Sequence, residues 1–259
     1  MNEQQILTAC LCLWLAVLGA VFGSFLDCAA SRWAAGDPHP FAGRSRCASC
    51  AHTLGAMDLI PVFSYLFRRG QCRYCGERIP AECLAAELAG AAGLLCLGLR
   101  FGWTLELGQW VVWALLLLAL SLTDWEKRVI PDRLLILLAA NRAVWFFFLG
   151  HGVAELLEAA AALAVPAALL ALVLAMEKLL GREAMGGGDI KLLAALALYL
   201  NWAELLLTLL AACALGLVWA AGVRREKGGA LPFGPFLAAG ALLIVCYSGP
   251  VLDWYFGLF

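Results

Sequence analysis

Two aspartates have the residue type and setting most suggestive of catalysis in this chain of 259 residues. Asp124 ends a long apolar run, and Asp189 begins another directly after Gly186, Gly187 and Gly188. An ionisable side chain at the edge of a long apolar segment is costly, so it usually has a partner or a task. We therefore expect Asp124 and Asp189 to act together as catalytic residues.

Two facing carboxylates can share one proton, because like charges a few ångströms apart cannot both ionise cheaply. One can then act as the base on a water molecule while the other donates a proton to a scissile carbonyl. This is the chemistry of aspartic peptidases. A Ser-His-Asp alternative is disfavoured, because the three histidines lie in expected loops without a nucleophile signature: His39, His52 and His151.

The glycine run before Asp189 predicts a close approach of the backbone to a neighbour or substrate, with positive φ allowed. It also places Asp189 at a helix entrance, where the helix dipole favours the ionised carboxylate. An N-cap aspartate after a flexible linker is the structural alternative. We predict that Gly186, Gly188 and Lys191 position the substrate, although Lys191 could instead extend to the membrane surface.

Four cysteines form two Cys-x-x-Cys pairs separated by 21 residues: Cys47 with Cys50, and Cys72 with Cys75. This pattern favours a tetrahedral zinc ion, and four thiolates leave no position for water, so the zinc is expected to be structural. The flanking Gly70 and Gly76 would let the backbone wrap tightly around the metal. Disulfides, redox chemistry or free thiols are the alternatives.

The elements that must position these residues are membrane helices. The chain is 64% hydrophobic and 14% charged, whereas soluble domains average about 45–50% and about 25%. We therefore predict an all-α polytopic membrane protein embedded in a lipid bilayer. A net charge of −1 argues against a nucleic-acid partner. Eight spans are expected, over 6–26, 83–99, 108–123, 134–149, 154–176, 190–200, 203–223 and 232–249.

The distribution of basic residues predicts the orientation of these spans. Sixteen of the 18 lysines and arginines lie in alternate connections, and only Arg100 and Arg142 lie on the other side. Since basic loops stay in the cytoplasm, residues 27–82 and both aspartates are expected on the cytoplasmic side, with both termini outside. A reducing compartment also disfavours disulfides between the four paired cysteines.

At this point the sequence resembles the type IV prepilin peptidases. The family's Gly-x-Gly-Asp element matches residues 186–189, and its first aspartate, ahead of an Ile-Pro-Asp tail, matches Asp124 ahead of residues 130–132. The paired cysteines match, as do residues 60–66 and 69–73 between or beside them. Glu87 fits an acidic position after that loop, and Asp27 stands where the family has asparagine.

The resemblance implies an aspartic endopeptidase of the bacterial inner membrane. It would cleave the basic leader of prepilins and pseudopilins after a glycine, on the cytoplasmic side. It also implies N-methylation of the new terminus with S-adenosylmethionine. We accordingly divide the chain into a first transmembrane helix (1–26), a cytoplasmic tetra-cysteine zinc domain (27–82) and a transmembrane peptidase core (83–259).

Two other functions are compatible with parts of the sequence. An ion-coupled transporter would also use intramembrane acids and helices broken near glycines, but both aspartates lie at the ends of spans and no convincing internal repeat is found. A zinc-bearing scaffold without catalysis would explain the cysteines but not the paired aspartates.

Overall fold

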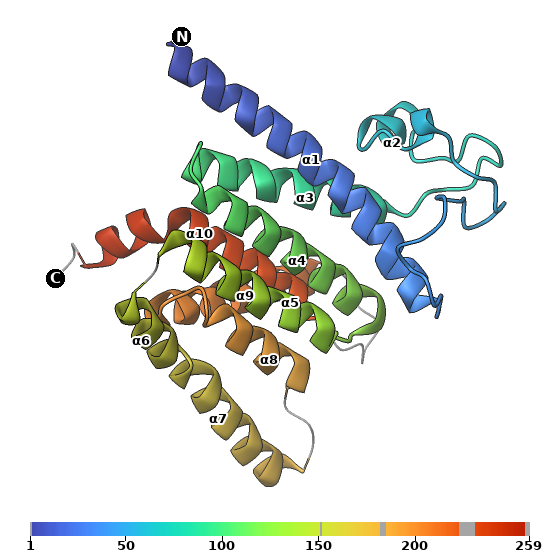
Figure 1. The fold of residues 1–259 in the computed structure, drawn as a ribbon. Coiled ribbons are helices and arrows are strands. Elements are labelled where there is room, and N and C mark those ends of the chain that lie inside the picture. The colour runs from blue at the N-terminus through green and yellow to red at the C-terminus, as the bar shows by residue number, and fades with distance from the viewer. Residues whose placement is uncertain (1, 151, 182–184, 223–230, 257–259) are drawn as a thin grey trace. The chain divides into compact units, whose positions relative to one another are not determined.

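The computed structural model describes residues 2–150, 152–181, 185–222 and 231–256, and Figure 1 shows these as helices joined by loops. Within the described residues there is no β-strand, only two isolated bridges in the cysteine loop. The chain divides into two compact units, Met1–Lys127 and Arg128–Phe259. The predicted all-α class is confirmed.

The first unit contains three long helices, α1 (Glu3–Ala34), α3 (Ala81–Phe101) and α4 (Glu106–Lys127). The loop between α1 and α3 carries a short 3-10 turn, η1 (Ala56–Asp58), and a five-residue helix, α2 (Phe63–Phe67). This loop holds all four paired cysteines. The predicted metal-binding domain therefore lies in the chain between α1 and α3.

Glycines allow α1 and α3 to pack in backbone contact. A Cβ atom added at Gly19 would overlap the carbonyl oxygen of Gly90, and one added at Gly90 would overlap that of Gly19. One helical turn along, a Cβ at Gly23 would overlap the carbonyl of Ala86. Gly19 and Gly23 have the Gly-x-x-x-Gly spacing by which membrane helices approach closely. This contact fixes the position of α3 on α1.

The last turn of α4 lies beside the end of α1 and the start of α3. The indole nitrogen of Trp125 donates to Glu82 over 3.3 Å, and the Ser31 hydroxyl donates to Glu126 over 3.3 Å. Asp124 is thereby held at the same end of this unit as the cysteine loop. The distribution of basic residues likewise predicts that Asp124 and the cysteine loop lie on the same side of the membrane.

The cysteine loop contains the same backbone turn twice, 25 residues apart. In the first turn, Cys47 N–H donates to the carbonyl of His52, and residue 51 N–H donates to the carbonyl of Cys47. In the second turn, Cys72 N–H donates to the carbonyl of Glu77, and Gly76 N–H donates to the carbonyl of Cys72. Antiparallel bridges close both turns, Arg46 with Thr53 and Gln71 with Arg78.

The residue after each second cysteine has a left-handed backbone. Gly76 has φ +73°, and Gly70, before the second turn, has φ +69°, which is how these two glycines let the backbone turn tightly. In the first turn the equivalent of Gly76 is Ala51, with φ +56°. A side chain in this conformation costs about 1–2 kcal/mol relative to glycine. The first turn is therefore the more strained of the two.

The second unit comprises α5 (Asp132–Leu149), α6 (Val153–Ala162), α7 (Ala164–Leu180), α8 (Gly187–Leu196), α9 (Trp202–Gly222) and α10 (Gly234–Phe256). Half of the residues of the ten-residue helix α8 are buried: Ile190, Leu192, Leu193, Ala195 and Leu196. The helices α9 and α10 pack closely, because a Cβ at Gly240 would lie 2.8 Å from the Thr208 carbonyl oxygen.

Within the part of the chain that the structure describes, five helical segments are long and apolar enough to cross a membrane: α1, α3, α4, α9 and the nearly continuous Val153–Leu179 of α6 and α7. The expected eight spans are not confirmed. The helix α5 has the length but carries Asp132, Arg133 and Arg142, and α8 is too short. In α10 the apolar stretch Gly234–Tyr247 is shorter than the five candidate spans.

Replacing Ala51 with glycine should stabilise the cysteine loop by about 1 kcal/mol, because it removes the strain of a left-handed alanine. Gly76→Ala is the matched opposite change, since open space surrounds its Cβ position and only the backbone conformation opposes it. Chemical unfolding of the purified protein should order the variants as A51G above the parent and the parent above G76A. An unchanged or lower stability of A51G would contradict the repeated turn.

Replacing Gly19 with alanine should lower stability by about 1–3 kcal/mol, because the added methyl group forces α1 from α3. Thermal unfolding in detergent measures this loss. Gly222→Ala is the control, since nothing lies within 4 Å of a Cβ there and alanine is the better helix former. Equal melting temperatures for the two variants would argue against the close helix contact.

Candidate functional site

The four predicted cysteine ligands lie together at one point of the loop. Their sulfur atoms are all within 4.8 Å of one another, and the sulfurs of Cys47 and Cys75 are 3.8 Å apart. Four sulfurs at about 2.3 Å from a central zinc ion would be about 3.8 Å apart along each edge of the tetrahedron. The residues present thus fit a tetrahedral metal ion.

Disulfide pairing does not fit this geometry. All eleven cysteines lie in the described part of the chain, and each has a free thiol. A sulfur separation of 3.8 Å between Cys47 and Cys75 is far from the about 2.05 Å of a disulfide. The cluster is therefore a set of thiols that could hold a metal ion.

The electrostatics of the cluster also favour a cation. Hydrogen bonds from the backbone N–H groups of Cys50 and Ser49 lower the pKa of the Cys47 thiol to about 6. At Cys75 the backbone N–H of Glu77 favours the thiolate, but burial and the neighbouring thiols outweigh it and raise the pKa to about 12. Crowded thiols resist full ionisation, and a bound divalent cation removes that conflict.

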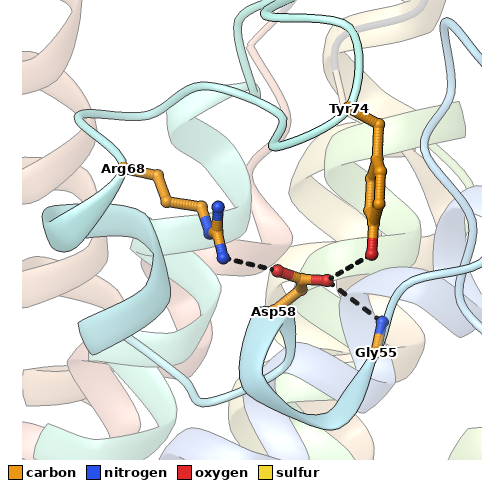
Figure 2. Close-up of polar contacts among 4 residues, drawn as sticks. All are labelled: Gly55, Asp58, Arg68 and Tyr74. Carbon is orange, nitrogen blue, oxygen red and sulfur yellow. Dashed lines mark hydrogen bonds and ion pairs between the residues drawn. The ribbon is translucent and has the colours of Figure 1, made fainter.

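Asp58 connects the two cysteine turns, a connection that sequence reasoning missed. Its carboxylate accepts hydrogen bonds from the backbone N–H of Gly55 at 3.1 Å and the hydroxyl of Tyr74 at 3.3 Å, and it pairs with Arg68 at 2.9 Å (Figure 2). Tyr74 lies between the second pair of cysteines, and its ring packs against the ring of His52 in the first turn, with the ring centroids 3.6 Å apart and the planes tilted by 31°. This network orients both halves of the metal cluster.

Glu87 ties the loop to α3. Its buried carboxylate accepts a hydrogen bond of 2.7 Å from the backbone N–H of Val62. Val62 has φ +64°, a strained conformation for a β-branched residue, and the bond to Glu87 helps to hold it. The sequence indicated an acidic position at Glu87 but gave no partner for it.

Asp124 lies in α4, three residues before the helix ends, and only 5% of it is exposed. The neighbouring Thr123 is also buried and donates to the carbonyls of Ala119 and Leu120. A negative charge is disfavoured at the C-terminal end of a helix. Capping does not explain an aspartate here.

Asp189 is the third residue of α8, so the N-cap alternative for it is wrong. Gly186 is the N-cap, with extended backbone, and the Asp189 N–H donates to the Gly186 carbonyl at 3.1 Å. The carboxylate lies near the cap, since a Cβ at Gly186 would be 3.3 Å from its Oδ2. The expected helix-entrance position, where the dipole favours a negative charge, is confirmed.

The glycine run permits close packing with helical and extended backbone, not with the positive φ that the sequence allowed. None of residues 186–188 has positive φ, because Gly187 and Gly188 already belong to the helix. A Cβ at Gly188 would lie 3.3 Å from Cβ of Ile130. The close neighbour within this unit is therefore the buried Ile130.

Lys191 has a partner that the sequence did not indicate. Its ammonium group pairs with Asp132 at 2.8 Å, with both side chains more than half exposed. Exposed pairs contribute little to stability. The pair links the start of α8 to the start of α5, and a substrate-positioning role for Lys191 stays a prediction.

The two candidate catalytic aspartates belong to different units, Asp124 to Met1–Lys127 and Asp189 to Arg128–Phe259. The four cysteines and Glu87 belong to the first unit. The structure thus brings the predicted metal ligands together, whereas the meeting of the two carboxylates stays a prediction.

Comparison with known proteins covers both units. Residues 17–101 match the model of the bacterial Peptidase A24 N-terminal domain, and residues 111–221 match that of the type IV leader peptidase family. The first match contains all four paired cysteines, and the second contains both aspartates. No solved structure matches the chain.

Curated relatives agree over most of the chain. The prepilin leader peptidase/N-methyltransferase of Bacillus subtilis (strain 168) is 34% identical, over 93% of this chain and 96% of that protein. The protein with the same name from Dichelobacter nodosus is 35% identical, over 83% of this chain and 74% of that protein. The one from Burkholderia pseudomallei (strain 1026b) is 39% identical, over 80% of this chain and 68% of that protein. This chain belongs to the type IV leader peptidase family.

Proposed function

We propose that this protein is a membrane-embedded aspartic endopeptidase that removes the leader of prepilins and pseudopilins and N-methylates the new terminus. The observation that carries this proposal is the family match over residues 111–221, a range that includes Asp124 and Asp189, the two aspartates that we assign to catalysis. The relatives named above are prepilin leader peptidases/N-methyltransferases. A transporter is not supported by these matches.

The helix positions suggest how the two carboxylates divide the work. Asp189 lies in the first turn of α8, where the dipole stabilises a negative charge, so we assign it as the base that removes a proton from water. The resulting hydroxide adds to the carbonyl carbon of the scissile bond after the leader's glycine. Asp124, buried near a helix C-terminus, donates its proton first to the carbonyl oxygen. Asp189 then passes the proton that it took from water to the leaving nitrogen, and Asp124 takes a proton back from a hydroxyl of the tetrahedral intermediate. The carbon–nitrogen bond breaks, the amine leaves, and both aspartates return to their starting protonation states.

The proposed site faces the cytoplasm at the edge of the inner membrane. The end of α4 that carries Asp124 lies beside the end of α1 and the start of α3, which also bound the arginine-rich loop. Since basic loops stay in the cytoplasm, this end of the unit is assigned to that side, with both termini outside. A substrate helix could then remain in the bilayer while its leader is cut.

The metal in the cysteine cluster is proposed to be zinc with a structural role. Cys47, Cys50, Cys72 and Cys75 would supply all four ligands, which leaves no open coordination position for a reacting water. A loop of this size has little core of its own, so metal binding would supply folding energy. For the second activity, S-adenosylmethionine is the methyl donor that the family implies.

Replacing either aspartate by asparagine should reduce leader cleavage by at least about 100-fold, because each change removes a proton-transfer group. D124N and D189N should be compared with the parent in cleavage of a purified prepilin, followed by mass measurement of the product. Glu158→Gln, on an exposed position of α6, is the control and should cleave normally. A D124N or D189N protein that is folded and cleaves at the parental rate would refute the dyad.

Metal analysis of the purified protein should find about one zinc ion per chain. Cys47→Ser and Cys75→Ser should lose that zinc, whereas Cys213→Ser, an exposed thiol on α9, should retain it. Removal of zinc with a chelator should lower the thermal stability of the parent. A parent without metal, or zinc retained by both cluster variants, would contradict the proposed centre.

A further inference from the structure

The loop between α1 and α3 exposes large apolar side chains although it lies outside the long helices. On α2 the exposed fractions are 72% for Phe63, 62% for Leu66 and 94% for Phe67, and Met57 on the preceding turn is 71% exposed. Positions 63, 66 and 67 share one side of a helix. An apolar patch of this kind outside the long helices marks an interaction surface.

Arginines adjoin this patch. Arg68 and Arg69 follow α2 directly, and Arg73 lies in the second cysteine turn. A cavity of about 530 Å³ is lined by Met57 and Phe67 together with Arg68, Gln71, Cys72 and Arg73. Over residues 56–79 four arginines stand against two acids, one of which, Asp58, already pairs with Arg68. The cavity thus combines an apolar wall with cationic groups.

Contacts within the first unit hold this patch at the depth where the membrane helices begin. Val62, next to α2, is bonded to Glu87, which is six residues or about 9 Å inside α3. On the other side of the loop, the rings of Phe41 and Phe25 are 6.3 Å apart, and Arg32 of α1 donates to the carbonyls of Ala42 and Arg44. Figure 1 shows α2 folded back toward α1 and α3 rather than extending beyond the end of α1.

We propose that the Met57–Arg73 segment is an interfacial anchor that binds anionic phospholipid of the bilayer crossed by α1 and α3. Phe63, Leu66 and Phe67 would enter the boundary between headgroups and acyl chains, while Arg69 and Arg73 meet lipid phosphates. The bilayer is the occupant that the structure favours, because both ends of the loop are covalently continuous with helices long enough to span it. The cysteine cluster would then be held against the membrane surface beside the end of α4.

Photocrosslinking of the full-length protein in nanodiscs tests this anchor. A benzophenone amino acid is placed at Phe67, at Phe63 or, as the control, at Glu77, which is exposed on the second cysteine turn. Mass spectrometry then measures lipid adducts in discs of phosphatidylcholine with or without phosphatidylglycerol. Lipid adducts should be several-fold more abundant at Phe67 and Phe63 than at Glu77, and phosphatidylglycerol adducts should exceed its share of the lipid.

Arginine variants test the charge contribution separately. Arg69→Gln or Arg73→Gln, in the protein with the probe at Phe67, should reduce the preference for phosphatidylglycerol by about fivefold. Arg46→Gln, an exposed arginine of the first cysteine turn, should leave it unchanged. Thermal unfolding and prepilin cleavage by each variant establish that the protein is folded and separate this outcome from failure of the proposed peptidase.

Three results would overturn the proposal. Equal lipid labelling at Phe67 and Glu77 would show that the patch does not enter the bilayer. Crosslinks from Phe67 chiefly to a second copy of the chain or to added prepilin would assign the patch to a protein partner. An unchanged phosphatidylglycerol preference in both patch variants would remove the arginine–phosphate contact.

Discussion

Asp124 keeps its carboxylate buried one turn from the end of α4, in a turn that is bonded to both other long helices of the first unit. Burying a carboxylate is costly unless neighbouring groups stabilise it or it is protonated. The last turn of α4 is held by Trp125 and Glu126 against the neighbouring helices. In the proposed mechanism this acid gives its proton to the scissile carbonyl.

The backbone contact of α1 with α3 provides the rigid frame for that turn. Gly19, Gly23 and Gly90 leave no space for side chains between the two helices, so the helix ends next to Asp124 are fixed in relation to each other. The same ends support the cysteine loop through Glu87 and Arg32. A structural metal in that loop would therefore stabilise a segment that is already bonded to the frame of the proposed active site.

Sequence reasoning predicted the cysteine cluster better than the membrane architecture. The two Cys-x-x-Cys pairs predicted four gathered thiols. Gly76 was expected to let the backbone wrap tightly, and it does so with a left-handed φ of +73°. Ala51 was not predicted, since its strained backbone contradicts its residue type, and only the repeat of the turn reveals it. Asp58 was missed because its three partners are up to 16 residues away in sequence.

The span count shows the limit of hydropathy as a guide. The helix α8 is apolar because half of it is buried within the second unit, and its ten residues are too few to cross a bilayer. In α5, three charged residues interrupt an otherwise apolar segment. The start of α8 was likewise misjudged, because glycines suggested a flexible linker where Gly187 and Gly188 are helical. Both features of α8, its apolar character and its helical glycines, belong to a helix packed within the second unit.

The most direct test of the central claim is whether the side chains at positions 124 and 189 meet in the membrane. A protein with Asp124→Cys and Asp189→Cys, and with the seven cysteines outside the metal cluster replaced by alanine, would be treated with a short bifunctional thiol reagent. A Ser31→Cys/Glu126→Cys pair, whose parent side chains are hydrogen-bonded at 3.3 Å, is the positive control. The account predicts efficient intramolecular crosslinking of positions 124 and 189. Efficient crosslinking of the control pair, with none between 124 and 189, would contradict it.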